Sequence, residues 1–259
     1  MMAYENILYK VKDRIATVTL NRPEYLNGFA PGMTEELTDV FYEMAQDDEV
    51  LVSILTGAGR AFCAGHFMKD RNSAGEKKEW PKRAPKLFSN YAATWEYPKP
   101  LIGAINGDCY GGGLNYVLGC DIIIASTQAR FCFPQARIGI IPAWPGAPAL
   151  ALFVGKAKAA EMALMSRPMS GEDAYRWGLA NKVVPHDQLM DEARAWAQEI
   201  AGLAPISTRL IKDDLRESWE VHFNRSANRL RFAAVSKTED CVEGDRAFKE
   251  KRAPVFKGR

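Results

Sequence analysis

The chain has 259 residues, of which 47% are hydrophobic and 25% are charged. This composition excludes a disordered tail, a fibrous repeat and a disulfide scaffold, and the length allows one large domain or one with a small appendage. The 34 Lys and Arg residues against 32 Asp and Glu residues leave a formal net charge of +2. So small a surplus argues against nucleic acid as a partner, although a local basic patch for a small phosphorylated ligand remains open.

The cysteines and the N-terminal sequence indicate in which cellular compartment the protein is expected. Five cysteines are present, without a Cys-x-x-Cys pair, and four of them sit in apolar runs. This usage predicts buried free thiols in a reducing compartment. The N-terminal sequence has no basic region followed by an apolar one, and no stretch approaches about 18 uninterrupted apolar residues. We therefore expect a cytoplasmic protein without a membrane partner.

The first half of the chain alternates strand patterns with helical ones. Residues 7–20 alternate in polarity around a polar turn and predict a hairpin, and the apolar spacing over residues 33–44 predicts a helix. Strands covered on both faces are predicted for the apolar runs 50–57, 101–107 and 120–126. Strands and helices in this order favour an α/β fold over a sandwich or a bundle.

The remaining segments differ in composition. Residues 68–100 are rich in Lys, Pro and Trp and predict a surface excursion, with a helix at about residues 86–95. Charged helical patterns follow in segments 187–203, 206–220, 223–236 and 238–252. We therefore divide the chain into an α/β core, residues 1–195, and a helical region, residues 196–259, that packs on the core or on another subunit.

Three consecutive glycines, Gly111, Gly112 and Gly113, lie directly after a predicted strand and directly before a predicted helix. Without a Cβ they let a ligand touch the main chain, and they expose unpaired N–H groups at the positive end of the helix. Such a place stabilises an oxyanion, but a glycine triplet equally permits tight packing of a helix on a strand. The chain has no GxGxxG spacing and no GxxxxGK[ST] loop, so nucleotide binding by those routes is not supported.

A second glycine-bearing turn, residues 56–70, also follows a predicted strand. If its backbone approaches the glycine triplet, amide donors from two loops converge on one carbonyl oxygen, which is the geometry that acyl chemistry requires.

Seven motifs now stand in a fixed order: NRPEYLN, TGAGRAFCAG, PKPLIGAINGxxxGGG, CDIIIAS, ARFxxPxxxIGIIP, GLANKVVP and EDCVEGDRAFKEKRAPVFKGR. In this order they resemble the enoyl-CoA hydratase/isomerase family, the crotonase superfamily, from about residue 5 to residue 258. The resemblance implies an α/β fold, a crotonase-like spiral of ββα turns with a helical C-terminal trimerisation region. It further implies a homotrimer or a dimer of trimers, an acyl-CoA thioester as substrate, and no cofactor, because coenzyme A is part of the substrate.

The resemblance also assigns residues by motif position. It implies an oxyanion hole made of the backbone N–H groups of His66 and Gly112, which would stabilise a thioester enolate. We expect the side chain of His66 to line the pocket or position the substrate rather than act as a base. For coenzyme A the resemblance implies contacts from Arg22, Ala64, Lys69 and, out of a neighbouring subunit, Lys257.

At two positions the chain departs from the family pattern. Hydratases of this family carry a glutamate two residues after the glycine triplet and another directly after FxxP, where this chain has Asn115 and Gln135. An amide can orient a water molecule but cannot accept a proton. Because the loss of one general base costs about 10² to 10⁴ in rate, we expect little ordinary hydration.

Two aromatic residues, Tyr116 and Trp144, are candidates for lining the acyl pocket, although packing alone would also explain them. Together with the two amides they would bind the substrate, and they point to an alicyclic or aromatic acyl group. No metal site is expected, because three scattered histidines and unpaired cysteines lack ligand spacing.

The sequence thus predicts a lyase or isomerase of this family that stabilises a thioester enolate. Decarboxylation and carbon–carbon bond cleavage need the oxyanion hole but not the two glutamates, whereas isomerisation needs at least one base. The alternative is a family member that binds acyl-CoA without turnover.

Overall fold

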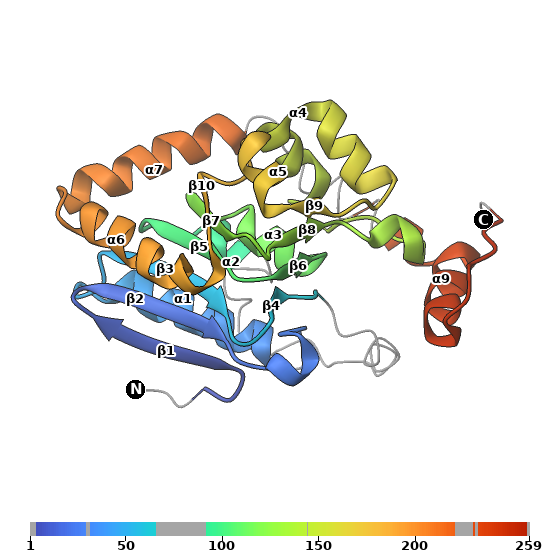
Figure 1. The fold of residues 1–259 in the computed structure, drawn as a ribbon, viewed down its shortest axis with the longest axis horizontal. Helices are drawn as coiled ribbons and strands as arrows, with labels where there is room; N and C mark the ends of the chain where they lie inside the picture. The colour runs from blue at the N-terminus through green and yellow to red at the C-terminus, as the bar shows by residue number, and fades with distance from the viewer. Residues whose placement is uncertain are drawn as a thin grey trace.

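The computed structural model describes residues 4–29, 32–65, 92–143, 145–220, 230 and 233–257. Two sheets organise it (Figure 1). The six-stranded sheet has the order β1 (Ile7–Lys12), β2 (Ile15–Leu20), β3 (Val52–Gly57), β5 (Leu101–Ile105), β7 (Ile122–Ser126) and β10 (Lys182–Val184). The four-stranded sheet has the order β4 (Ala61–Cys63), β6 (Asp108–Tyr110), β8 (Arg130–Cys132) and β9 (Met169–Ser170).

The predicted N-terminal hairpin is confirmed. Strands β1 and β2 pair antiparallel, and their turn consists of Asp13 and Arg14, with φ values of 53° and 62°. Two central residues with positive φ are typical of the turn whose twist matches that of the flanking strands. From β2 onward the six-stranded sheet is parallel, and the predicted strands β3, β5 and β7 lie at its buried centre.

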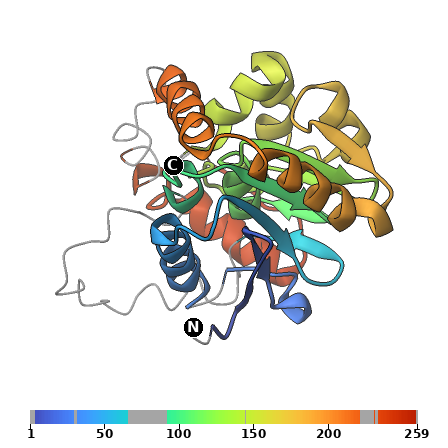
Figure 2. The same cartoon turned by 90° about the vertical axis from the view of Figure 1, so that its left-hand side faces the viewer.

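Helices cover both faces of the six-stranded sheet. The α-helices are α1 (Met33–Gln46), α2 (Ala92–Trp95), α3 (Gly112–Val117), α4 (Gly146–Leu164), α5 (Gly171–Arg176), α6 (Leu189–Ala201), α7 (Pro205–Glu220) and α9 (Glu239–Glu250). Short 3-10 helices are η1 (Pro23–Tyr25), η3 (Gln135–Ile138) and η4 (His186–Gln188). The apolar side of α1 belongs to the larger core cluster, while α6 buries Ala193 and Ala197 against the opposite face of the sheet (Figure 2).

The connections repeat one pattern. After β3, β5 and β7 the chain leaves the large sheet and adds β4, β6 and β8 to the small one. A helix follows, as α3 does after β6, before the chain returns. This is the predicted spiral of ββα turns, and it brings the glycine-bearing turns after β4 and β6 to one edge of the small sheet, because these strands are parallel neighbours.

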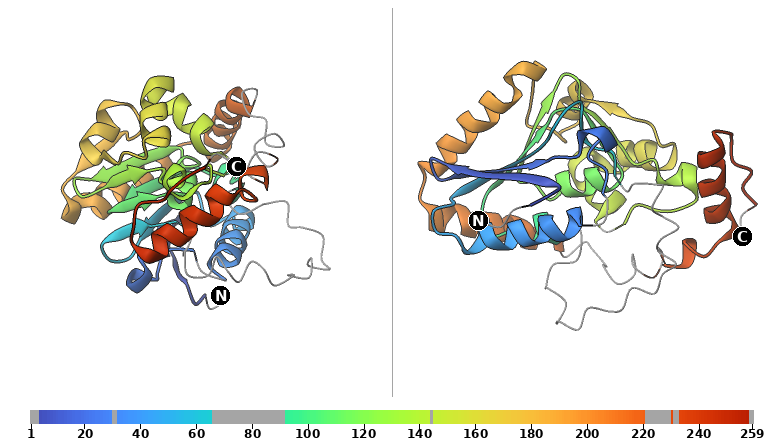
Figure 3. Two further views of the ribbon diagram at one scale, coloured as in Figure 1. Left: turned by 90° about the vertical axis from the view of Figure 1, so that its right-hand side faces the viewer. Right: turned by 90° about the horizontal axis from the view of Figure 1, so that it is seen from below.

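The C-terminal helices agree with the predicted segments 187–203, 206–220 and 238–252, whereas residues 223–229, 231 and 232 of segment 223–236 lie outside the described residues. The expected division at residue 195 falls within α6, whose last turns still pack on the sheet. Helix α9 lies at one end of the molecule, where it contacts η3 (Figures 1 and 3). An oligomerisation role for this region stays a prediction.

Three further predictions are a helix at about residues 86–95, buried free cysteine thiols, and no segment long and apolar enough to span a membrane. Of the expected helix, only α2 lies within the described residues. All five cysteines are free and buried, as predicted. None of the described helices is both long and apolar enough to cross a membrane.

Candidate active site

The two glycine-bearing turns are in contact. Gly65 follows β4, and a Cβ built at Gly65 would lie 2.8 Å from Tyr110 O and 3.1 Å from Gly112 N. Gly65 also has a φ of +87°, which side-chain-bearing residues rarely adopt. Only glycine therefore lets the chain after β4 pass directly beside the first residue of α3.

Hydrogen bonds from the segment after β2 hold the turn after β4 in place. Ala64 N donates to Leu26 O at 3.0 Å, and Phe29 N donates to Gly65 O at 2.8 Å. The same segment carries Arg22, whose guanidinium carbon lies 4.5 Å from the centroid of the Tyr25 ring. Arg22 and Ala64 thus lie on adjacent loops, and their binding of coenzyme A stays a prediction.

The three glycines of the triplet have separate tasks. Gly111 has a φ of 56°, and its N–H donates to Cys132 O at 2.9 Å. Gly113 is required for packing, because a Cβ there would collide with the backbone of Cys63. Gly112 is the first residue of α3, so its N–H has no acceptor within the helix. Its contact with a bound oxygen stays a prediction.

Asn115 is completely buried, and both ends of its amide are bonded to one loop. Its Nδ2 donates to Ala143 O at 3.3 Å, and its Oδ1 accepts from Gly146 N at 3.2 Å. These partners stand on either side of residue 144. The amide therefore joins α3 to the loop before α4, and a contact with substrate stays a prediction.

Gln135 opens η3 and is 8% exposed. Its Nε2 would lie 3.4 Å from a Cβ built at Gly111, so the side chain reaches the glycine triplet. Its Oε1 is buried and has no hydrogen-bond partner among the described residues. An unpartnered buried acceptor is uncommon, and it calls for a donor from water or from a ligand.

Tyr116 lies in the core behind the triplet, with 1% exposure. Its ring centroid is 5.1 Å from that of Phe29, at an interplanar angle of 50°. Contact between Tyr116 and substrate stays a prediction. His66, Lys69 and Trp144 lie outside the described residues.

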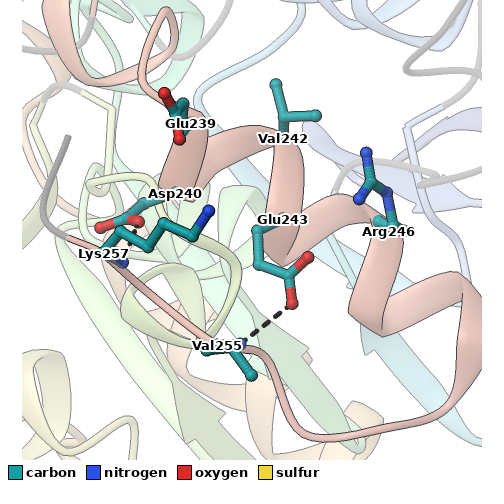
Figure 4. A pocket seen from close by; sticks show the side chains of 7 residues that line it. All are labelled: Glu239, Asp240, Val242, Glu243, Arg246, Val255 and Lys257. Carbon is teal, nitrogen blue, oxygen red and sulfur yellow. Dashed lines mark hydrogen bonds between the residues drawn. The ribbon is translucent and has the colours of Figure 1, made fainter.

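Lys257 lies far along the chain from the triplet, beside α9. Figure 4 shows it at a small pocket together with Glu239, Asp240 and Glu243. The volume of this pocket is about 220 Å³. The backbone N of Lys257 donates to Asp240 Oδ1 at 2.6 Å. Its side chain is exposed. Coenzyme A contacts from a neighbouring subunit stay a prediction.

The ionisable groups near the triplet are occupied or neutral. Asp108 is paired with Arg130 at 2.9 Å, and Asp121 accepts from Lys212 Nζ at 2.8 Å. Burial raises the pKa of the Cys63 thiol to about 12, so this thiol is not a nucleophile at neutral pH. Within the described ranges, no group of three or more His, Cys, Asp or Glu side chains is placed to hold a metal ion.

Sequence reasoning did not single out Asn27, whose side chain joins the segment after β2 to the residues at the start of β4. It has a φ of 53°, its Oδ1 accepts from Arg22 N at 2.8 Å, and its Nδ2 donates to Ala58 O at 2.9 Å and to Ala61 O at 2.8 Å. The signal was the Asn-Gly pair at residues 27–28, since asparagine tolerates positive φ in turns.

Comparisons with known proteins agree with this geometry. The family model for enoyl-CoA hydratase/isomerase matches residues 10–259. A probable enoyl-CoA hydratase from Mycobacterium bovis is 34% identical, over 98% of this chain and 99% of its own length. The (E)-benzylidenesuccinyl-CoA hydratase of Thauera aromatica is 35% identical, over 97% of this chain and 99% of its own.

The fold is shared with solved structures as well. The crystal structure of a carnitinyl-CoA hydratase from Mycobacterium avium superposes with a TM-score of 0.87 at 31% identity, covering 99% of this chain and 100% of that one. Sequence, fold and the contact between the two glycine-bearing turns lead to one conclusion: the chain is an acyl-CoA enzyme that belongs to the enoyl-CoA hydratase/isomerase family.

Proposed function

We propose that the protein binds an acyl-CoA thioester and stabilises its enolate at two main-chain donors. One is Gly112 N–H, and the other is the N–H of His66, which follows Gly65 in the chain. The observation that carries this proposal is the close approach of Gly65 to Gly112 N, at 3.1 Å from a Cβ built on Gly65. A pre-positioned donor aimed at a developing oxyanion contributes about 2.7–4 kcal/mol to the rate of acyl chemistry.

The reaction that fits best is a lyase step without a carboxylate base. Neither Asn115 nor Gln135 can take a proton from water. In a decarboxylation, the bond to the departing carboxylate breaks, its electron pair enters the thioester enolate, carbon dioxide leaves, and the enolate later takes a proton from solvent. Carbon–carbon cleavage by a retro-aldol route places the electron pair of the broken bond in the same enolate, releases an aldehyde or ketone, and passes the proton of the β-hydroxyl to solvent. Both reactions use the oxyanion hole, so efficient hydration is not the expected activity.

For the acyl group we propose an alicyclic or aromatic structure. The Thauera aromatica relative is named for a benzylidenesuccinyl thioester, and Phe29 and Tyr116 form an aromatic pair close behind the triplet. A protein that binds acyl-CoA without turnover is the competing proposal. The open acceptor of Gln135 favours an enzyme, because it provides a buried polar contact for a substrate or for water.

We also propose a cytoplasmic homotrimer or dimer of trimers. Apolar side chains of 58–72% exposure follow α7 and the loop before it, at Leu203, Ile206, Leu210, Ile211 and Leu215. Contiguous apolar surface of this kind is typical of a subunit interface. In such an assembly Lys257 would reach the coenzyme A of a neighbouring subunit, and no other cofactor is required.

The first experiment identifies the reaction. The protein is incubated with straight-chain, alicyclic, aromatic and malonyl-type CoA thioesters, and the products are identified by mass spectrometry. Loss of carbon dioxide or cleavage of the acyl chain supports the proposal. Rapid hydration of a straight-chain enoyl thioester contradicts it, and binding without any product supports the non-catalytic alternative.

The second experiment removes one donor. Gly112→Pro deletes the N–H at the first position of α3, where proline is compatible with a helix. Gly112→Ala is the matched control, because it keeps the N–H. We expect Gly112→Pro to lower turnover about 10²- to 10³-fold relative to Gly112→Ala, at similar thermal stability. Equal turnover in the two folded variants would refute an oxyanion contact at this nitrogen.

A further inference from the structure

A second cavity, of about 370 Å³, lies apart from the glycine triplet, between the six-stranded sheet and the start of α6. Its volume is at the lower end of the range for small-molecule sites. The cavity is lined by Thr17, Thr19, Thr56, Gly57, Gly59, Asn106, His186, Leu189, Met190 and Arg194.

The position of this cavity follows from the sheet topology. Strands β2, β3 and β5 are parallel neighbours, and Thr19 and Thr56 are register partners near the carboxyl ends of the first two. Asn106 follows directly after β5. In open parallel sheets, the crevice beyond the carboxyl ends of the strands is the usual place for a ligand.

The charge of the lining is positive. Arg194 is its cationic side chain, and no Asp or Glu lines the cavity among the described residues. Arg194 is 3.5 Å from Asp191, but the two side chains are 56% and 85% exposed, so this pair is weak. A ligand oxyanion can therefore compete for the guanidinium.

The remaining polar groups are suited to a hydroxyl group. His186 Nδ1 lies 3.1 Å from Asn106 O, and because a carbonyl only accepts, the proton is on Nδ1 and Nε2 is left for a ligand. The hydroxyls of Thr17 and Thr19 have no hydrogen-bond partner within the part of the chain that the structure describes.

Asn106 gives an independent indication of a missing partner. It is 6% exposed, and its Nδ2 donates to Gly59 O at 2.9 Å and to Ala61 O at 3.1 Å. These two acceptors fix the orientation of the amide. Its Oδ1 is buried and has no partner among the described residues, so the wall of the cavity lacks one donor.

We propose that this cavity binds a small hydroxylated anion, with its phosphate or carboxylate group on Arg194 and its hydroxyl on His186 and the threonines. The site is separate from the acyl-CoA site. Gly59 of the cavity precedes β4 (Ala61–Cys63) and Gly65 of the turn follows it, so the two sites lie at opposite ends of this strand.

The test measures direct binding to the full chain by isothermal titration calorimetry at constant ionic strength. The probes are glycerol 3-phosphate, malate and uncharged glycerol. We expect saturable binding of one or both anions and none of glycerol, and the tighter anion identifies a phosphate or a carboxylate as the preferred group. Absence of saturable binding of both anions at millimolar concentration overturns the proposal.

Matched variants locate the binding. Arg194→Gln removes the proposed anion contact, and Arg176→Gln is its control, because Arg176 belongs to a similar exposed i,i+3 pair with Asp173 outside the cavity. We expect Arg194→Gln to weaken anion binding about tenfold or more, and Arg176→Gln to leave it unchanged. A second variant, Thr17→Val with Thr19→Val, should also weaken it. Equal effects of the two arginine changes, or no effect of Arg194→Gln, overturn the assignment.

Discussion

Asn115 and Gln135 present the same functional group to one site, yet their surroundings differ. The amide of Asn115 is bonded at both ends, to Ala143 O and Gly146 N. The amide of Gln135 reaches the glycine triplet and leaves its Oε1 without a partner among the described residues. The difference teaches that two side chains with the same functional group have separate structural roles. Asn115 joins α3 to the loop before α4, whereas the Oε1 of Gln135 is available to a bound ligand or water.

The largest expected effect is on stability. Asn115→Ala leaves a half-buried carbonyl at Ala143 and a buried N–H at Gly146 without their partner, and a buried group without a partner costs about 1–3 kcal/mol. We expect the free energy of unfolding to fall by about 2–4 kcal/mol, measured by urea denaturation. A loss below about 0.5 kcal/mol, typical of a surface change, would show that the two bonds do not hold the loop.

The next effect is a gain of activity. Gln135→Glu places a carboxylate beside the triplet without breaking a hydrogen bond to any described residue, so crotonyl-CoA hydration should rise about tenfold or more over the parent. The increase is measured by the absorbance of the enoyl thioester. The double variant with Asn115→Glu should hydrate faster still if it folds, although the loop then loses its donor to Ala143 O. Unchanged hydration in both folded variants contradicts our account of the missing bases.

The smallest effect is expected at the same residue without charge. Gln135→Leu removes an acceptor that has no partner among the residues of known placement, so the free energy of unfolding should change by less than about 1 kcal/mol. The KM for the thioester identified by the panel should rise. A large loss of stability together with an unchanged KM would assign Gln135 to the structure, as for Asn115.

The elements were predictable because their patterns are local. The apolar runs at residues 50–57, 101–107 and 120–126 contain the strands β3, β5 and β7, since a strand buried on both faces reads as a continuous apolar segment. The glycine triplet likewise lies where a strand ends and a helix begins. The helical C-terminal region was predictable from its charged helical patterns, whereas the spiral of ββα turns came from the resemblance to a family.

The contacts of the site were less predictable, because they join distant residues. Asn115 reaches a carbonyl 28 residues away, and no periodicity encodes such a pair. The burial of one lysine was also not predictable from the sequence. Lys99 is completely buried, and its Nζ donates to Met44 O and Asp47 O, both at 2.6 Å, at the end of α1. A charged side chain normally predicts exposure, but here two backbone carbonyls at the end of a helix satisfy the ammonium.

One oxygen atom links the candidate active site and the cavity lined by Arg194. Ala61 O accepts from Asn27 Nδ2 at 2.8 Å and from Asn106 Nδ2 at 3.1 Å. Asn27 shapes the segment after β2 that holds the turn after β4. Asn106 forms a wall of the cavity lined by Arg194. Movement of this carbonyl toward either asparagine lengthens its bond to the other. A shift of this kind would couple the two sites, and linkage then requires that each ligand alter the affinity of the other by the same factor.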